Sequence, residues 1–123
     1  MPAGETRNLT AATAHAGALE YGITRRDGAL RVSLSGILDR VSLDDLMRRV
    51  SLALPARGVA VVLDGAELTH LDYRCVAPLM RWNRGLRSFG HRLRLEGWSG
   101  YLQAILAMED WDRELGWQPV RMP

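Results

Sequence analysis

Three side chains that could take part in nucleophilic catalysis lie close together in the sequence: His70, Asp72 and Cys75. A cysteine becomes a nucleophile when a histidine takes its proton and an acid orients that histidine. The partners of such a triad are brought together by the fold and need not be neighbours in sequence. Cys75 also falls on the apolar stripe of a predicted helix, where a thiol is inert. We therefore interpret Cys75 as a core residue and expect no catalytic site.

The spacings that are typical of metal and nucleotide sites are not found. His15, His70 and His91 show no ligand spacing, and the sequence has no His-x-x-His or Cys-x-x-Cys element. No glycine-rich segment has the spacing of a P-loop or a dinucleotide fingerprint. A single cysteine cannot form an internal disulfide. We expect neither a metal nor a cofactor.

The basic residues are unusual in type and in position. All 16 are Arg, and 14 acids leave a net charge of only +2. No acid lies between Asp72 and Glu96, whereas acids crowd a later segment. This segregation would steer an acidic partner to the arginine-rich window. Nucleic acid is not expected, because aromatic residues do not interleave with the arginines. The window contains Arg74, Arg81, Arg84, Arg87, Arg92 and Arg94, and the later acids are Glu109, Asp110, Asp112 and Glu114.

The chain of 123 residues has the size of one globular domain. Residues 1–18 are rich in Ala, Thr and Gly, and we expect them to form a mobile leader. They lack the apolar stretch of a secretion signal, and no segment has the ~20 apolar residues needed to cross a bilayer. We therefore expect a cytoplasmic protein with one domain over residues 19–117 and a C-terminal tail over residues 118–123.

Alternation of apolar and polar residues predicts a β-hairpin near the start of the domain. Leu30, Val32 and Leu34 alternate with polar residues, as in a strand with one buried face. Asp27-Gly28 is a turn signal that links this strand to a shorter one around residues 20–26.

A first helix and a central strand should follow the hairpin. Ser42 and Asp45 resemble a capping box, and apolar residues then recur at helical spacing until Pro55. The apolar run at residues 59–63 does not alternate, which predicts a strand covered on both faces.

A second helix should follow Asp72, with its arginines opposite an apolar stripe. Pro78 leaves two alternatives open, a helix that starts later than Asp72 suggests or a kinked one. Residues 91–95 alternate as a strand, and Ser99 can cap a third helix. Three of the four tryptophans lie in the last quarter of the chain with Tyr101, and we interpret them as packing residues. The apolar stripe is Cys75, Leu79, Trp82, Leu86 and Phe89, and the tryptophans are Trp98, Trp111 and Trp117.

The element order is β-β-α-β-α-β-α, which predicts an α/β fold with right-handed crossovers. We expect a mixed sheet of four to five strands, with an N-terminal hairpin, packed by three to four helices.

Four segments occur in an order that resembles the STAS domain, the family of bacterial anti-sigma-factor antagonists that also occurs at the end of sulfate transporters. The resemblance covers residues 20–117 and implies the STAS fold. The segments are Gly36-Ile37-Leu38-Asp39, Val61-Val62-Leu63-Asp64, Leu68-Thr69-His70-Leu71-Asp72 and Gly90-His91-Arg92-Leu93-Arg94-Leu95.

The sequence departs from the family pattern at the regulatory residues. In regulated members, the serine after the signature Asp is phosphorylated by a partner kinase that is also the anti-sigma factor. Added charge then expels the antagonist through repulsion and desolvation. Here Tyr73 stands at the serine position and Cys75 replaces the glycine. We expect that this degenerate phosphorylation site does not accept phosphate from a serine kinase.

The resemblance implies a non-enzymatic protein-interaction module that contributes to transcription regulation or signalling. The partner would be an anti-sigma-factor-like kinase, and a homodimer is possible. One alternative is a small cytoplasmic STAS subunit that braces the ATPase of a lipid-transport ABC system. Another is a small-molecule sensor or enzyme with a pocket near His70 and Cys75. The predicted partner-binding residues are Asp39, Asp72, Tyr73, Arg74, Met80, Arg81, Arg84 and Arg87.

Overall fold

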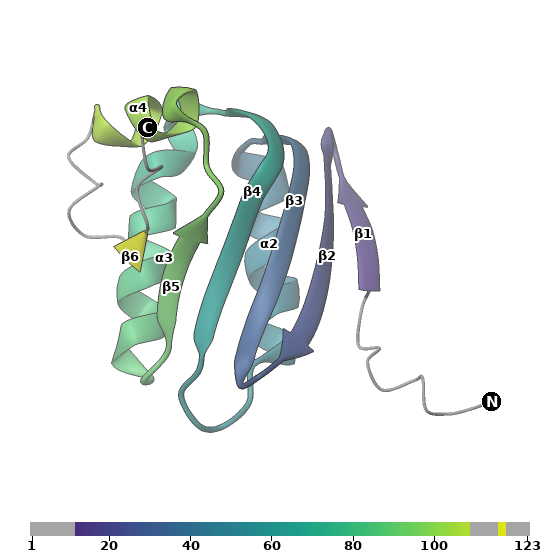
Figure 1. Ribbon diagram of the computed structural model, residues 1–123, viewed down its shortest axis with the longest axis vertical. Coiled ribbons are helices and arrows are strands. Elements are labelled where there is room, and N and C mark those ends of the chain that lie inside the picture. The colour runs from purple at the N-terminus through teal and green to yellow at the C-terminus, as the bar shows by residue number, and fades with distance from the viewer. Residues whose placement is uncertain (1–11, 109–115, 118–123) are drawn as a thin grey trace.

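The computed structural model describes residues 12–108 and 116–117, and a six-stranded mixed sheet lies at its centre (Figure 1). The strands follow one another across the sheet in the order of the sequence. Three antiparallel strands come first: β1 (Ala12–Ala16), β2 (Leu19–Arg26) and β3 (Ala29–Leu38). Three further strands run parallel to β3: β4 (Ala60–Leu71), β5 (Arg92–Glu96) and β6 (Gly116–Trp117).

The predicted hairpin joins β2 to β3 and is confirmed. Arg26 pairs with Ala29, so Asp27 and Gly28 form a two-residue turn. Both have positive φ, 52° and 75° respectively, as a type I′ turn requires. The turn sets a register in which Tyr21 lies opposite Leu34 and both side chains are buried.

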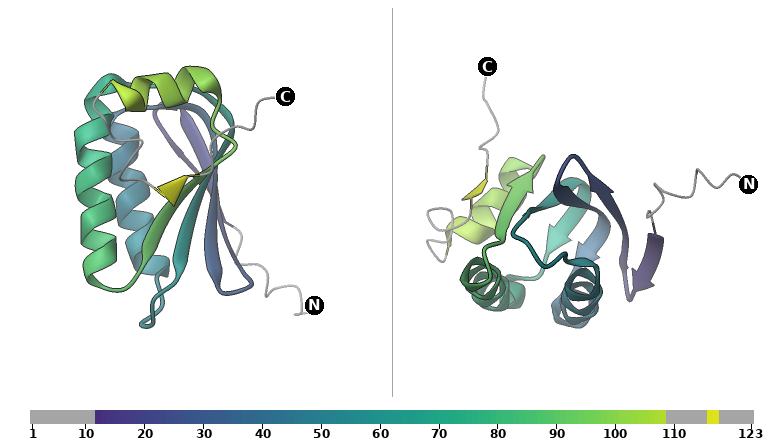
Figure 2. Two further views of the ribbon diagram at one scale, coloured as in Figure 1. Left: turned by 60° about the vertical axis from the view of Figure 1, so that its left-hand side comes forward. Right: turned by 90° about the horizontal axis from the view of Figure 1, so that it is seen from below.

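Two helices cover one face of the sheet, and a third lies across its end (Figure 2). The covering helices are α2 (Arg40–Ala53) and α3 (Val76–Ser88), which are the crossovers between the parallel strands β3, β4 and β5. A 3₁₀ turn, η1 (Tyr73–Cys75), leads into α3, and α4 (Gly100–Ala107) follows β5. The α/β fold with its crossovers is therefore confirmed.

The core fills the space between the sheet and these helices. Leu34 and Leu63 from the sheet pack with Leu46 and Leu79 from the helices in one buried cluster. Trp98 joins this cluster from the β5–α4 connection, and its indole Nε1 donates a hydrogen bond to the Leu63 carbonyl at 3.0 Å. The predicted packing role of Trp98 is confirmed, whereas that of Tyr101 is wrong, because its side chain is 56% exposed. Trp111 lies outside the described residues.

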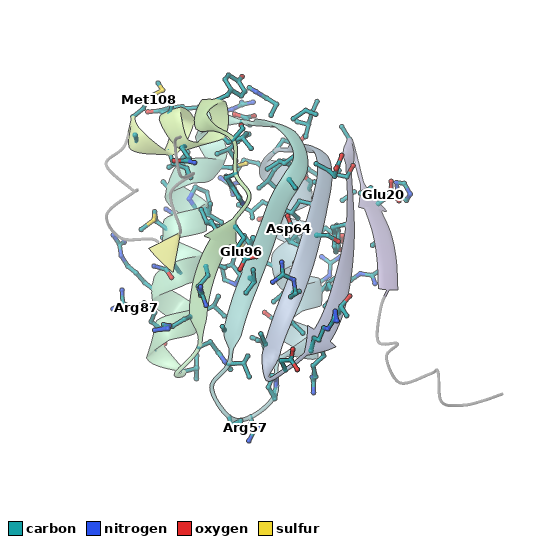
Figure 3. The ribbon with its side chains drawn as sticks, viewed as in Figure 1. Glu20, Arg57, Asp64, Arg87, Glu96 and Met108 are labelled. Carbon is teal, nitrogen blue, oxygen red and sulfur yellow. The ribbon has the colours of Figure 1, made fainter. Side chains whose placement is uncertain are left out.

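The uncovered face of the sheet carries charged side chains (Figure 3). Arg31 on β3 reaches across two strands, and its Nη2 lies 2.8 Å from the Glu96 carboxylate on β5 and 3.6 Å from that of Asp64 on β4. All three side chains are roughly one-third exposed, so the pairing contributes little to stability.

The sheet has more strands than the four to five expected. Residues 12–16, predicted to belong to a mobile leader, form the edge strand β1 against β2. Alternation did not reveal β1, because its small residues contribute mainly backbone hydrogen bonds to the ladder. The sixth strand, β6, has two residues, too few for a periodic signal. Residues 1–11 and the predicted tail at 118–123 lie outside the described residues.

The starts of both covering helices differ from the sequence prediction. Asp39 is the N-cap of α2, and Ser42 is the third helical residue rather than the cap. Asp45 lies beyond the first turn, and its carboxylate accepts a hydrogen bond from the Tyr21 hydroxyl at 2.5 Å. At the second helix, α3 begins at Val76, which places Pro78 in its first turn, where a missing N–H costs no helical hydrogen bond. The later start of this helix is therefore the alternative that holds.

Two further predictions need correction, one on the length of a strand and one on the burial of a side chain. The strand predicted over residues 59–63 continues to Leu71, because β4 goes on pairing with β3 through two register shifts. Phe89, predicted on the buried stripe of α3, is 76% exposed. It is the C-cap residue, so the helical spacing no longer fixes its direction.

Candidate protein-interaction site

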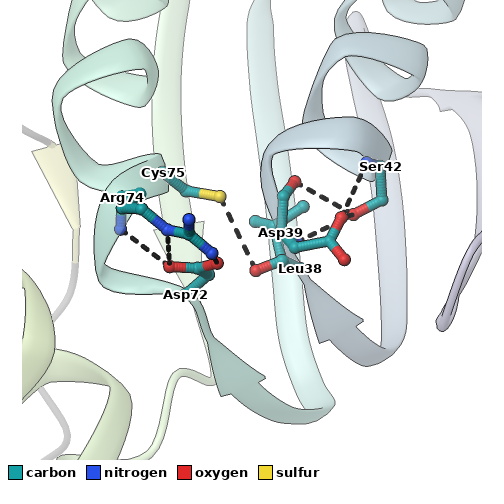
Figure 4. Close-up of polar contacts among 6 residues, drawn as sticks. All are labelled: Leu38, Asp39, Ser42, Asp72, Arg74 and Cys75. Atoms are coloured by element: carbon teal, nitrogen blue, oxygen red, sulfur yellow. Dashed lines mark hydrogen bonds and ion pairs between the residues drawn. The ribbon is translucent and has the colours of Figure 1, made fainter.

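The starts of α2 and of η1 lie side by side at one end of the sheet (Figure 4). Asp39 follows β3 and Asp72 follows β4, and these parallel strands pair as far as Leu38 and Leu71. The backbone N–H of Asp72 donates to the Leu38 carbonyl at 2.9 Å, which joins the two turns. The parallel pairing of β3 and β4 thus brings together Asp39 and Asp72, which are 33 residues apart in the sequence.

Asp39 is held by reciprocal hydrogen bonds with Ser42. The backbone N–H of Ser42 donates to Asp39 Oδ1 at 2.9 Å, and the backbone N–H of Asp39 donates to Ser42 Oγ at 2.8 Å. The hydrogen bond from the Ser42 N–H is the main cause that lowers the pKa of the Asp39 carboxyl, while nearby Asp72 opposes it. Asp39 is therefore an ionised, rigid N-cap.

Asp72 is the N-cap of the 3₁₀ turn η1, and its carboxylate pairs with Arg74. Its Oδ1 accepts hydrogen bonds from the Arg74 backbone N–H at 2.9 Å and from Arg74 Nε at 3.2 Å, and its Oδ2 accepts one from Arg74 Nη2 at 2.8 Å. These bonds from Arg74 lower the pKa of the Asp72 carboxyl. The Arg74 guanidinium therefore neutralises the charge of the Asp72 carboxylate, and only part of the guanidinium is available to a partner protein.

The structure does not bring His70, Asp72 and Cys75 together as a catalytic triad. Cys75 is buried with its Sγ 3.7 Å from the Leu38 carbonyl, and burial raises the pKa of the thiol to about 12. His70 is exposed, and its Nδ1 lies 2.7 Å from the hydroxyl of Tyr101, whose ring stacks on the imidazole. Among the described residues, no group of three or more His, Cys, Asp or Glu could hold a metal.

Exposed apolar side chains surround the two capped acids, and sequence reasoning identified only one of them. Tyr73 is 49% exposed in η1, Val41 is 72% exposed in the first turn of α2, and Ile37 near the end of β3 is 37% exposed. The two missed residues had a signal: Ile37 and Val41 flank the Leu38-Asp39 segment and fall outside the apolar spacing of their elements.

The predicted arginine face is present on α3, but Met80 does not belong to it. Arg81, Arg84 and Arg87 are exposed, and Figure 3 shows Arg87 pointing outward beside α3. Met80 was predicted as an apolar surface contact and is completely buried. Its position, four residues after buried Val76 and next to Leu79, widens the buried side of the helix. We define the docking surface as Ile37, Asp39, Val41, Asp72, Tyr73, Arg74, Arg81, Arg84 and Arg87.

Residues 21–119 match the family described as "Mlab, STAS domain", and the chain belongs to this STAS-domain family. The predicted membership is therefore confirmed. No curated protein matches the chain with significant similarity.

Solved structures share the fold at low sequence identity. An anti-sigma factor antagonist from Mycobacterium paratuberculosis has a TM-score of 0.68 at 17% identity, over 83% of this chain and 86% of the other. The unphosphorylated anti-sigma factor antagonist SpoIIAA has a TM-score of 0.64 at 13% identity, over 81% and 89%. The murine anion transporter Slc26a9 also has a TM-score of 0.64 at 13% identity, over 78% of this chain and 17% of the transporter. No helix in the described part of the chain is long and apolar enough to span a membrane.

Proposed function

We propose that this protein is a non-enzymatic interaction module that binds another protein through the docking surface. The observation that carries the proposal is the exposure of Ile37, Val41 and Tyr73 around two acids fixed as caps. Apolar side chains on rigid turns can bury area against a partner with little loss of conformational freedom. Ile37 and Val41 extend the surface that the family resemblance predicted.

The arginines on α3 give the proposed surface a preference for acidic partners. Arg81, Arg84 and Arg87 lie on the exposed side of one helix, and charges at the edge of an interface mainly set association rate and specificity. Arg74 contributes less, because its guanidinium is paired with Asp72.

A capture experiment with matched variants tests the docking surface. Val41→Asp with Tyr73→Asp places charge on the apolar patch, and Arg81→Glu with Arg84→Glu reverses the arginine face. Leu52→Asp is the control, because Leu52 is also apolar and exposed on α2 but lies near the other end of the helix. We expect both double variants to lose partners from a lysate of the source organism and the control to retain them. Full recovery with all three folded variants would contradict the proposal.

Two classes of protein partner are candidates for this surface, and each has an observation in its favour. The likeness to two anti-sigma factor antagonist structures favours a partner of the anti-sigma-factor type, as in the leading prediction. The match to the MlaB STAS family favours the alternative, an ATPase subunit of a lipid-transport ABC system. Tyr73 at the serine position suits the second class, which needs no serine phosphorylation.

The identity of the captured protein separates these two classes. An ATPase that co-purifies with wild type and is lost with Val41→Asp/Tyr73→Asp would establish the transport role. A sigma-factor-binding kinase lost in the same way would establish transcriptional control. Genes encoding a permease and an ATPase beside this gene, or a sigma factor and a kinase, would give the same distinction. Cytoplasmic location and a homodimer remain predictions.

A further inference from the structure

An apolar groove lies between the C-terminal ends of α2 and α3, at the opposite end of these helices from the capped acids Asp39 and Asp72. Its volume is about 420 Å³, within the roughly 300–1,000 Å³ of small-molecule sites. Leu54 and Pro55 line one side, and Trp82, Leu86 and Phe89 line the other. Figure 2, in the view from below, shows the ends of both helices on the same side of the sheet. Among the described residues, no side chain fills the groove, so its apolar walls are open to a ligand.

A smaller, basic hollow adjoins this groove. Its volume is about 160 Å³, and Pro55 lines both hollows. Arg25 from β2 and Arg57 from the loop after α2 supply two guanidinium groups, and Figure 3 shows Arg57 at the far end of that loop. Nη2 of Arg25 donates to the Ala53 carbonyl at 2.7 Å, which fixes the group and leaves other N–H donors for a ligand. No acid is among the described residues that line either hollow.

Two loops pack tightly against each other beside His91, which lines the groove. The backbones at Gly58 and Gly90 are so close that a Cβ on Gly58 would lie 2.2 Å from the Gly90 carbonyl oxygen. Beside this contact, the Val59 N–H donates to Nδ1 of His91 at 3.1 Å. Because Nδ1 accepts that bond, the neutral ring carries its proton on Nε2. His91 lines the groove, so this end of the protein combines apolar walls, a fixed imidazole and two cations.

We propose that the two hollows together bind a small amphipathic anion, in which an alkyl or aryl chain carries a phosphate or carboxylate group. The chain would lie against Trp82 and Phe89, and the anionic group would pass Pro55 to reach Arg25 and Arg57. A planar guanidinium matches the oxygens of phosphate and carboxylate and pairs with them bidentately. The absence of lining acids from both described hollows favours an anion over a neutral or cationic ligand.

Three probes separate the contributions of the chain and the anionic group. Octyl phosphate carries both, octyl glucoside carries the chain without charge, and inorganic phosphate carries the charge alone. Each is titrated below its micelle concentration into the ¹⁵N-labelled full chain. The readout is the chemical shift of the Trp82 indole and of the backbone amides of residues 85–91 and 57–59. We expect octyl phosphate to bind at least tenfold more tightly than either of the other probes.

Two variants and a control locate the site. Gly85 lines the groove, and a Cβ added there meets nothing within 4 Å, so Gly85→Leu places an apolar side chain at the groove and removes a helix-destabilising glycine. Arg25→Gln with Arg57→Gln removes the charge from the basic hollow. Arg49→Gln is the control, since Arg49 is an exposed arginine of α2 that lines neither hollow.

The expected pattern is specific to this proposal. Gly85→Leu should weaken octyl phosphate binding at least tenfold while the midpoint of thermal unfolding stays the same or rises. The double arginine variant should bind octyl phosphate only as tightly as octyl glucoside, and Arg49→Gln should behave as wild type. Equal affinity for octyl phosphate and octyl glucoside in wild type would overturn the proposal, as would unaltered binding by folded Gly85→Leu. A groove that binds only peptides would show no saturable shifts with octyl phosphate and would also overturn it.

Discussion

The thiol of Cys75 lies against the Leu38 carbonyl, with its residue completely buried. A thiolate is the reactive form of cysteine, and burial raises the pKa of this thiol to about 12, well above physiological pH. Because its sulfur lies in the core, Cys75 acts as a packing residue and not as a reactive thiol.

We predict that Cys75 in the folded protein resists alkylation. Iodoacetamide at pH 8 should leave the native chain unmodified, because the thiol is neutral and inaccessible, and should modify it fully in concentrated urea. Mass spectrometry of the intact chain measures the added mass. Similar labelling rates in the native and unfolded states would contradict the prediction.

Tyr73 stands at the position that the family resemblance assigns to the phosphorylated serine. Tyr73 carries the one side-chain hydroxyl among residues 72–75, and a kinase site built for serine is too small for a tyrosine ring. We predict that a serine kinase of the anti-sigma-factor type adds no phosphate to residues 72–75, whereas Tyr73→Ser restores an acceptor. Phosphopeptide mapping distinguishes these outcomes, and phosphotyrosine at Tyr73 would show that a switch persists.

The stability of individual elements depends on the hydrogen bonds that cap the first turn of a helix and on close contacts between backbones. The cap at Asp39 stabilises α2 in its ionised form, since hydrogen bonds from Ser42 hold the pKa of the carboxyl below its ordinary value. A lowered pKa in the folded state means that this stabilisation is present above about pH 4, the unfolded value, and is lost as the pH falls through the folded value.

We predict that Asp39→Asn reduces the acid sensitivity of the protein. Asparagine caps a helix about as well as aspartate, so stability at pH 7 should change little. Below about pH 4 the free energy of unfolding should fall less steeply in the variant, because one titrating cap is gone. Urea unfolding at pH 7, 4 and 3 measures the slope, and Asp44→Asn, an exposed acid of the same helix, is the control. Identical slopes in wild type and Asp39→Asn would disprove the assignment.

Two glycines should respond to alanine in opposite directions. In α3, a Cβ at Gly85 meets open space, so Gly85→Ala should stabilise the protein by about 1 kcal/mol through helix propensity. At Gly58 the Cβ would collide with the Gly90 backbone, so Gly58→Ala should destabilise by about 1–3 kcal/mol. Thermal and urea unfolding of both variants check the signs. A neutral Gly58→Ala would mean that the two loops separate readily.

At the scale of the whole molecule, Trp98 ties the α4 end to the main core. Its indole donates to the Leu63 carbonyl of β4 and lies over Gly65, where a Cβ would come within 2.6 Å of the ring. One side chain thus connects the segment after β5 to the central strand.

We predict that Trp98→Phe lowers the free energy of unfolding by about 2 kcal/mol, since it removes a buried hydrogen bond and leaves a small cavity. Trp82→Phe is the matched control: Trp82 is only half-buried at the groove and should cost less. Urea unfolding, followed by far-UV circular dichroism, gives both values. Equal losses would show that Trp98 has no special role in joining α4 to the sheet.

Local patterns were sufficient for the elements whose signal lies in consecutive residues. The hairpin at Asp27-Gly28, the cap at Ser99 and the apolar side of α3 at Leu79 and Leu86 all follow from turn chemistry or helical period. Local patterns failed where backbone pairing or a distant partner decides the outcome, as in β1 and in the continuation of β4 to Leu71.

The sequence by itself determined the order of the elements from β2 to α4, the resemblance to the STAS family and most of the residues around Asp39 and Asp72, because these depend on periodicity and local motifs. Only the tertiary structure decided that Met80 is buried, that Ile37 and Val41 are exposed beside Tyr73, and that Arg25 and Arg57 line one hollow. The physical reason is that burial and convergence depend on how separate elements pack. A helical period gives the relative directions of side chains, but not how wide a stripe the neighbouring sheet will cover.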